Sequence, residues 1–131
     1  MARAPEDMTS EMIDFVTERH LATLTLVTSS GEPHVSPVGF TWDPETELAR
    51  VITWAGAKKV RHLADGPLKA VLCQVDGGRW LAFHGPATVT SDVHVNADAE
   101  RRYAERYRPP GDRGADRRTI EVAVQKVIGR A

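Results

Sequence analysis

Short extended segments separated by tight turns dominate this sequence. Residues 20–28 alternate leucine with threonine, which is the period of a strand with one buried face. Turn-forming residues at 29–32, 43–46 and 76–79 are typical of connections between antiparallel neighbours. The expected strands are 20–28, 33–42, 48–54, 68–75, 80–90 and 119–128. The pattern predicts an α+β, mainly β fold with about six antiparallel strands in a barrel.

Two or three helices are expected beside these strands. Residues 8–19 place Met8, Met12, Phe15 and Val16 at helical spacing, with Thr9 or Ser10 as the N-cap. A short helix at 60–65 ends at Gly66-Pro67, and residues 93–107 form a third helical segment. The helices therefore stand between or beside hairpins, as in an α+β domain.

Length and charge limit the class of protein. The 131 residues suit one domain, 1–131, with a tail at 1–7 and a flexible loop at 108–118. A net charge of −1 gives no general attraction to nucleic acid or to an anionic membrane. The sequence has no apolar run of membrane-spanning length and no signal-peptide pattern near residue 1, and its one cysteine is Cys73. We therefore expect a soluble cytoplasmic protein.

Two adjacent lysines stand at a strand-turn-helix corner. Lys58 and Lys59 follow the apolar strand 50–54 and begin the short helix. Ammonium groups, helix N–H groups and the positive end of the helix dipole would all favour one anion there. The alternative is a solvated helix start, although acidic residues are normally preferred at that position. The corner predicts a phosphate-binding site.

Other common sites lack support. The histidines, His20, His34, His62, His84 and His94, lie on separate expected elements and form no paired-ligand motif, so no metal site is expected. The sequence contains neither a GxGxxG nor a GxxxxGK[ST] motif. Ser29, Ser30 and Ser36 lack the context of a hydrolase nucleophile.

Residues 53–67, TWAGAKKVRHLADGP, resemble a signature of the flavin-binding split-barrel superfamily, which includes pyridoxamine phosphate oxidase. In that superfamily a threonine and two basic residues bind the cofactor phosphate. The resemblance therefore implies a split β-barrel in which Thr53, Lys58 and Lys59 bind phosphate, with the backbone at Val60. It also implies a homodimer with the cofactor at the subunit interface.

A wider resemblance, over about 100 residues, is to the deazaflavin (coenzyme F420)-dependent reductases of this superfamily. It is carried by segments such as 18–22, 38–41, 49–53, 71–77, 79–81, 102–108 and 120–122. Two departures separate the chain from the flavin mononucleotide (FMN) oxidases. Strand 33–42 offers only His34 where those enzymes place an arginine against the ring, and the chain lacks their C-terminal Arg/His segment. Pyridoxamine oxidation is therefore not expected.

The resemblance implies a reductase that transfers a hydride from reduced F420 to a conjugated acceptor, with biliverdin or a similar tetrapyrrole expected. Alternatives are an FMN-binding oxidoreductase and a non-catalytic carrier of F420, flavin or haem. Pro37, Val38 and Gly39 suit a slot for the ring, or alternatively mark a bulge. Arg79 and Trp80 are expected over the partner subunit's cofactor ring, or Trp80 in the core. No catalytic residue is assigned, because the cofactor carries the chemistry.

Seven arginines cluster late in the chain: Arg101, Arg102, Arg106, Arg108, Arg113, Arg117 and Arg118. Acidic neighbours between 98 and 116 largely offset them, which indicates a mixed-charge solvated surface. The alternative is that some of them bind the cofactor's glutamyl tail or the substrate's propionates.

Overall fold

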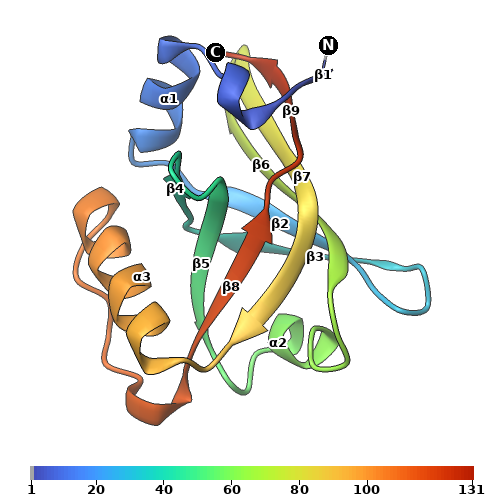
Figure 1. The fold of residues 1–131 in the computed structure, drawn as a ribbon, viewed down its shortest axis with the longest axis vertical. Helices are drawn as coiled ribbons and strands as arrows, with labels where there is room; N and C mark the ends of the chain where they lie inside the picture. Colours follow the sequence, from blue (N-terminus) through green and yellow to red (C-terminus); the bar gives the residue numbers. More distant parts are fainter. Residues whose placement is uncertain (1) are drawn as a thin grey trace.

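The computed structural model describes residues 2–131, and its strands form one antiparallel sheet (Figure 1). The strands are β1 (Ala2–Arg3), β2 (Ala22–Val27), β3 (Pro33–Val38), β4 (Thr41–Asp43), β5 (Leu48–Trp54), β6 (Leu68–Asp76), β7 (Arg79–Thr90), β8 (Arg117–Ala123) and β9 (Lys126–Arg130). Their order is β3-β2-β6-β7-β8-β5-β4, and β9 pairs with both β1 and β7. The α+β, mainly β class is confirmed, with nine strands among the described residues where six were expected.

Within the described part of the chain, three α-helices accompany the sheet: α1 (Ser10–Thr17), α2 (Lys58–His62) and α3 (Val93–Arg106). Thr9 is the N-cap of α1, as one of the two expected caps, and its hydroxyl accepts a hydrogen bond from the Met12 N–H at 3.2 Å. Asp92 caps α3 by accepting from the N–H groups of His94 and Val95. α3 packs against β4, β5 and β8, while α2 follows directly from the end of β5 (Figure 1).

The expected strand 33–42 is interrupted at Gly39-Phe40. Side chains satisfy the backbone of Phe40 at this point: its N–H donates to the Tyr107 hydroxyl at 3.1 Å, and its carbonyl accepts from Arg106 at 2.5 Å. Phe40 therefore takes its hydrogen bonds from α3 and the residue that ends it, and β3 and β4 become separate strands. Local alternation in the sequence carries no signal of partners 66 and 67 residues away.

The expected strand 119–128 is also two strands. β8 pairs with β5 and with the end of β7, whereas β9 pairs with the start of β7 and with β1. Between them the Gln125 N–H donates to the carbonyl of His84 at 2.8 Å. Gly85 makes this crossover possible, since a Cβ at that position would lie 1.9 Å from the Ala123 carbonyl oxygen.

Two segments expected to be irregular contain secondary structure. Residues 2–7, expected as part of the tail, hold β1 and a 3₁₀ helix at Pro5–Asp7. The expected loop 108–118 contains a 3₁₀ helix at Gly114–Asp116, and β8 begins at Arg117. Pairing of β1 with β9 and of Arg117 with Trp54 accounts for the added order.

The core lies between the inward face of the sheet and α1. Its largest fully buried side chains include Phe15, Phe40, Phe83, Leu24 and Leu72. Cys73 is only half-buried, because it alternates with the buried Leu72 and Gln74 and faces outward from β6. Within residues 2–131, no helix combines the length and apolar character that a bilayer crossing requires.

Candidate functional site

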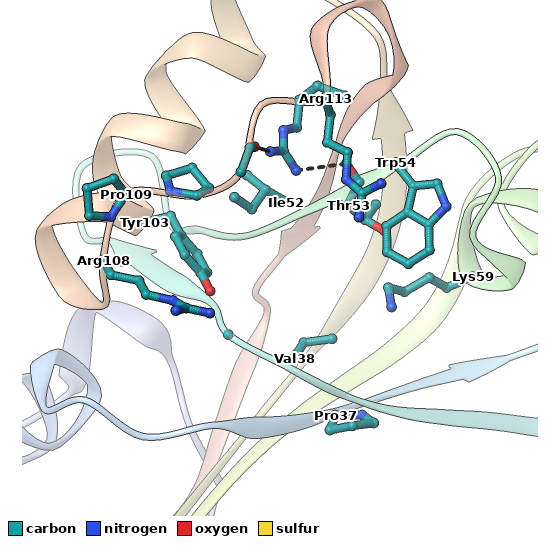
Figure 2. A pocket seen from close by; sticks show the side chains of 14 residues that line it. Pro37, Val38, Ile52, Thr53, Trp54, Lys59, Tyr103, Arg108, Pro109 and Arg113 are labelled. Carbon is teal, nitrogen blue, oxygen red and sulfur yellow. Dashed lines mark hydrogen bonds between the residues drawn. The ribbon is translucent and has the colours of Figure 1, made fainter.

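A pocket of about 550 Å³ opens between the ends of β3 and β5, α2, and the segment that follows α3 (Figure 2). It is lined by Pro37, Val38, Gly39, Ile52, Thr53, Trp54, Lys59, Tyr103, Arg108, Pro109, Pro110, Gly111, Arg113 and Arg117. Four of these side chains are cationic, and within the described residues the lining includes no aspartate or glutamate. The volume is that of a small-molecule site, and the charge favours an anionic ligand.

Thr53 supplies a buried hydroxyl group to this pocket. It lies near the end of β5, where its backbone pairs with Arg118 of β8. The residue is 2% exposed, yet within residues 2–131 its Oγ1 has no hydrogen-bond partner. A buried hydroxyl left unbonded costs about 1–3 kcal/mol. Thr53 Oγ1 is therefore suited to bind an oxygen atom of a ligand in the pocket.

The two adjacent lysines are not equivalent. Lys59 extends into the pocket (Figure 2), and burial lowers the pKa of its ammonium group. Lys58 is exposed and does not line the pocket. With 3.6 residues per turn, successive helical side chains point about 100° apart, so only one of the pair faces inward. Among residues 2–131, neither lysine has a carboxylate within salt-bridge distance.

Two histidines lie close to the lysines, and the pKa of one of them is affected by the nearby positive charges. His34 of β3 packs against His62 of α2, with ring centroids 5.0 Å apart. Burial lowers the pKa of His34, and the charges of His62, Lys59 and Lys58 lower it further. The lowered pKa favours the neutral form of the His34 imidazole beside these cationic side chains.

Pro37 and Val38 form the side of the pocket that faces Arg113 and Trp54 across the opening (Figure 2). β2 and β3 pair residue for residue from Val27–Pro33 to Ala22–Val38, so the expected alternative of a bulge at Pro37 is not found. Gly39 lines the pocket and also has a packing role. A Cβ there would lie 3.0 Å from the Tyr107 ring and 3.1 Å from the Tyr103 ring, so glycine admits these two tyrosines.

The remaining predicted binding residues lie outside this pocket. Val60 is buried, and its backbone N–H donates to the Ala57 carbonyl within the turn of α2. Arg79 and Trp80 lie at the turn between β6 and β7. The Arg79 guanidinium donates to Glu18 at 2.8 Å and to Asp76 at 2.5 Å. Within one chain these three residues therefore do not line this pocket.

The late arginine cluster separates into distinct groups. Arg101 and Arg102 form salt bridges with Asp98, as the mixed-charge surface predicted. Arg106 is a structural residue: it is half-buried and donates to the carbonyls of Glu18 and Phe40. Only Arg108, Arg113 and Arg117 line the pocket. Spacing along the chain does not separate these groups, because each depends on distant partners.

Arg117 stabilises one wall of the pocket through its hydrogen bonds. It is buried and donates to Glu100 at 2.9 Å, to the Thr53 carbonyl at 3.1 Å and to the Gly111 carbonyl at 2.6 Å. One guanidinium thus connects α3, β5 and the segment 108–113. The sequence patterns did not predict this connecting role of Arg117. The one feature that pointed to an ordered segment here is the Pro109-Pro110-Gly111 break beside the arginines.

Arg113 and Trp54 cover the opposite side of the pocket from Val38. The Arg113 guanidinium carbon lies 4.6 Å from the centroid of the Trp54 ring, and Trp54 is 41% exposed. In this cation–π contact the guanidinium lies over the face of the ring. The pocket therefore combines apolar side chains with cationic ones, which suits a ligand that has both an apolar part and an anionic group.

A group of possible metal ligands lies elsewhere. Glu18, His20 and Asp76 bring ligand atoms within 4.8 Å of one another. Arg79 already donates hydrogen bonds to both carboxylates. The cluster is thus an ion-pair network, and its carboxylates are held by a cation of the chain itself.

Comparison with known proteins adds a family and several relatives. The sequence profile described as Pyridoxamine 5'-phosphate oxidase matches residues 8–131. A protein of Mycobacterium tuberculosis (strain CDC 1551 / Oshkosh) named F420H(2)-dependent biliverdin reductase is 47% identical, and the alignment covers 100% of this chain and 94% of the relative.

Solved structures share the fold. A conserved hypothetical protein from Mycobacterium tuberculosis superposes with a TM-score of 0.77 at 20% identity, over 98% of this chain and 88% of the other. A protein named F420 Reductase superposes with a TM-score of 0.72 at 22% identity, over 92% of this chain and 98% of the other.

Proposed function

The chain belongs to the pyridoxamine 5'-phosphate oxidase family, and on this premise we propose that it is an F420H₂-dependent reductase. Its reaction is the transfer of a hydride from reduced deazaflavin to a conjugated acceptor, biliverdin or a similar tetrapyrrole. The observation that carries the proposal is the 47% identity, over the whole chain, to an F420H(2)-dependent biliverdin reductase. The cationic pocket, which has no acidic lining residue within the described chain, agrees with an anionic cofactor.

We propose that Thr53 and Lys59 bind the cofactor phosphate. Both residues line the pocket. Thr53 contributes a buried Oγ1 that has no hydrogen-bond partner among the described residues, and Lys59 contributes a partly buried ammonium group. Lys58 contributes through its charge from the exposed side of α2, and the Val60 N–H is occupied by its own helical turn. Pro37, Val38 and Gly39 would then support the ring, with Trp54 across the pocket.

Reduced F420 supplies a hydride when it is bound. The chain's own contribution is to hold the two reactants close together in the orientation that the transfer requires, and to exclude water from the apolar part of the pocket. Ile52, Val38 and Trp54 provide apolar surface, while Arg117 fixes Thr53 through its carbonyl. No side chain is required as a nucleophile, and solvent can supply the proton that completes the reduction.

The second candidate is an FMN-binding oxidoreductase, which the family description favours. Both cofactors carry a phosphate, so Thr53 and Lys59 suit either one. β3 offers His34 as its only basic residue, and the pKa of that imidazole is lowered mainly by burial. The absence of an arginine in β3 argues for the deazaflavin. Parallel titrations with F420 and FMN separate the two candidates by affinity.

We also propose that the protein is a cytoplasmic homodimer. The outward face of β2, β3 and β6 presents Val27, Val35 and Val75, of which the last two are 57% and 60% exposed. Exposed apolar faces of this kind are typical of subunit contacts. Trp80 lies opposite Val75 in the sheet, so in such a dimer Arg79 and Trp80 would lie near the partner subunit. The single cysteine agrees with a reducing compartment, and the net charge of −1 gives no reason to expect nucleic acid.

Turnover tests the proposed function. Purified protein is mixed with reduced F420 and biliverdin, and the return of the oxidised F420 absorbance is followed. The proposal predicts catalytic turnover that depends on both reactants. Tight binding of F420 without turnover would instead indicate a carrier, and turnover with reduced FMN alone would support the second candidate.

A further inference from the structure

A second hollow adjoins the cofactor pocket on the side away from α2. It has a volume of about 320 Å³ and is lined by Arg19, His20, Leu21, Tyr103, Tyr107 and Arg108. Tyr103 and Arg108 line both hollows, so the two share a common wall. In Figure 2, Arg108 and Lys59 extend toward the centre of the first pocket from opposite sides. A ligand that binds Lys59 at one end and crosses the first pocket toward Arg108 would therefore have the second hollow next to its other end.

Two cations border the second hollow. Within residues 2–131, neither Arg19 nor Arg108 has a carboxylate within salt-bridge distance. The nearby acids, Glu18 and Asp76, are bound by Arg79. Arginine forms paired, directional hydrogen bonds with carboxylates, so two such side chains without partners suit an anionic ligand.

The same hollow has an apolar, aromatic wall. The rings of Tyr103 and Tyr107 lie 4.8 Å apart, and Leu21 is 65% exposed. Tyr107 is fixed by its hydroxyl, which donates to the His20 carbonyl at 2.7 Å. Aromatic faces with arginines at the edge bind flat conjugated molecules that carry carboxylates.

We propose that the second hollow is the acceptor subsite, where Arg19 and Arg108 bind the carboxylate arms of a flat conjugated substrate. Its identification with a tetrapyrrole rests on the proposed function. Pro109-Pro110 restricts the backbone after Arg108, and Arg117 holds the Gly111 carbonyl. This segment is thus fixed before the substrate binds, which lowers the entropic cost of forming the arginine contacts.

The test compares a diacid ligand with its ester. Binding of biliverdin and of biliverdin dimethyl ester is titrated by visible absorbance, with wild type, Arg19→Gln, Arg108→Gln and the double variant. Arg101→Gln is the matched control, because Arg101 is exposed and pairs with Asp98 and Glu105 outside both hollows. F420 affinity is measured for every protein, and thermal melting confirms that these exposed substitutions leave the fold intact.

Wild type should bind the diacid at least about tenfold more tightly than the diester. Each single variant should reduce this ratio, and the double variant should abolish it. F420 affinity should stay unchanged in Arg19→Gln, because Arg19 lines the second hollow and not the cofactor pocket. If the double variant still prefers the diacid over the diester as wild type does, the proposal is overturned. The same holds if Arg19→Gln loses F420 affinity but keeps this preference. Turnover of biliverdin with no acid preference would contradict this subsite alone, whereas acid-selective binding without turnover would contradict the proposed function alone.

Discussion

Arg117 donates a hydrogen bond of 3.1 Å from its guanidinium to the backbone carbonyl of Thr53. The two residues lie on the neighbouring strands β8 and β5, and Thr53 carries the buried hydroxyl of the pocket. Glu100 of α3 holds the other side of the same guanidinium at 2.9 Å. The position of the Thr53 hydroxyl thus depends on a residue 64 positions later in the chain.

Arg117→Gln should reduce both stability and cofactor affinity. The substitution leaves the Thr53 and Gly111 carbonyls without their donors, which costs about 1–3 kcal/mol of unfolding free energy. Urea denaturation measures the first effect and F420 titration the second. Arg101→Gln, which removes only exposed salt bridges, should change stability by less than about 1 kcal/mol. Equal effects of the two substitutions would contradict the role given to Arg117.

Lys59→Gln should weaken F420 binding far more than Lys58→Gln. Lys59 faces the pocket, and a charged hydrogen bond to phosphate contributes about 1.5–3 kcal/mol, or roughly 10- to 150-fold in affinity. Lys58 is exposed and acts only through screened charge, so its loss should cost less than about threefold. Titrations at two salt concentrations distinguish the two contributions. Equal losses for both variants would show that the lysines are equivalent.

Tyr107→Phe should destabilise the protein, whereas Tyr103→Phe should not. The Tyr107 hydroxyl donates to the His20 carbonyl and accepts from the Phe40 N–H, so its removal leaves backbone groups unbonded at a cost of about 1–3 kcal/mol. Tyr103 packs on the same ring and lines both hollows. Urea denaturation of the two variants makes the comparison. If Tyr107→Phe has the same free energy of unfolding as wild type, the hydroxyl does not anchor Gly39-Phe40 and this account is contradicted.

Asp43 should make stability depend on acid pH. Burial alone would raise the pKa of this carboxyl, but hydrogen bonds from Thr46, Arg50 and the Glu45 N–H, with the charge of Arg102, lower it to about 2. A lowered pKa stabilises the folded protein above the unfolded value of 3.8, and that contribution, about 2 kcal/mol, is lost as pH falls from about 4 to about 2.

Comparison of wild type with Asp43→Asn measures this contribution. The stability difference between them should shrink as the pH of urea denaturation falls from about 5 to about 2. Asp65→Asn, at an exposed position outside these ion pairs, is the control. A difference between wild type and Asp43→Asn that stays constant over this range would contradict the lowered pKa.

Local sequence patterns predicted most of the fold. Period-two alternation and turn residues located the strands from 20 to 90, and the capping residue Thr9 located α1. The breaks at Gly39-Phe40 and at Val124-Gln125 were missed. Both are set by distant partners, Tyr107 and Arg106 in one case and His84 in the other, and a strand pattern contains no information on such contacts.

The site was predicted in part, for the same reason. The phosphate signature pointed to Thr53 and Lys59, which meet in one pocket with Pro37, Val38 and Gly39. It could not separate Lys59 from Lys58, because their difference arises from the direction of each side chain on α2. Nor could it select Arg108, Arg113 and Arg117 from seven neighbouring arginines, since the hydrogen bonds of Arg106 and the salt bridges of Arg101 and Arg102 are formed only in the folded chain.

Hydride transfer is the central claim, and isotopic labelling tests it most directly. Reduced F420 is prepared with deuterium at both hydrogen positions of the carbon that donates the hydride, and the protein is supplied with biliverdin in ordinary water. The account predicts one deuterium in the reduced tetrapyrrole by mass spectrometry, with oxidised F420 formed in equal amount. A reduced product without deuterium, or oxidation of F420 without a reduced product, would contradict it.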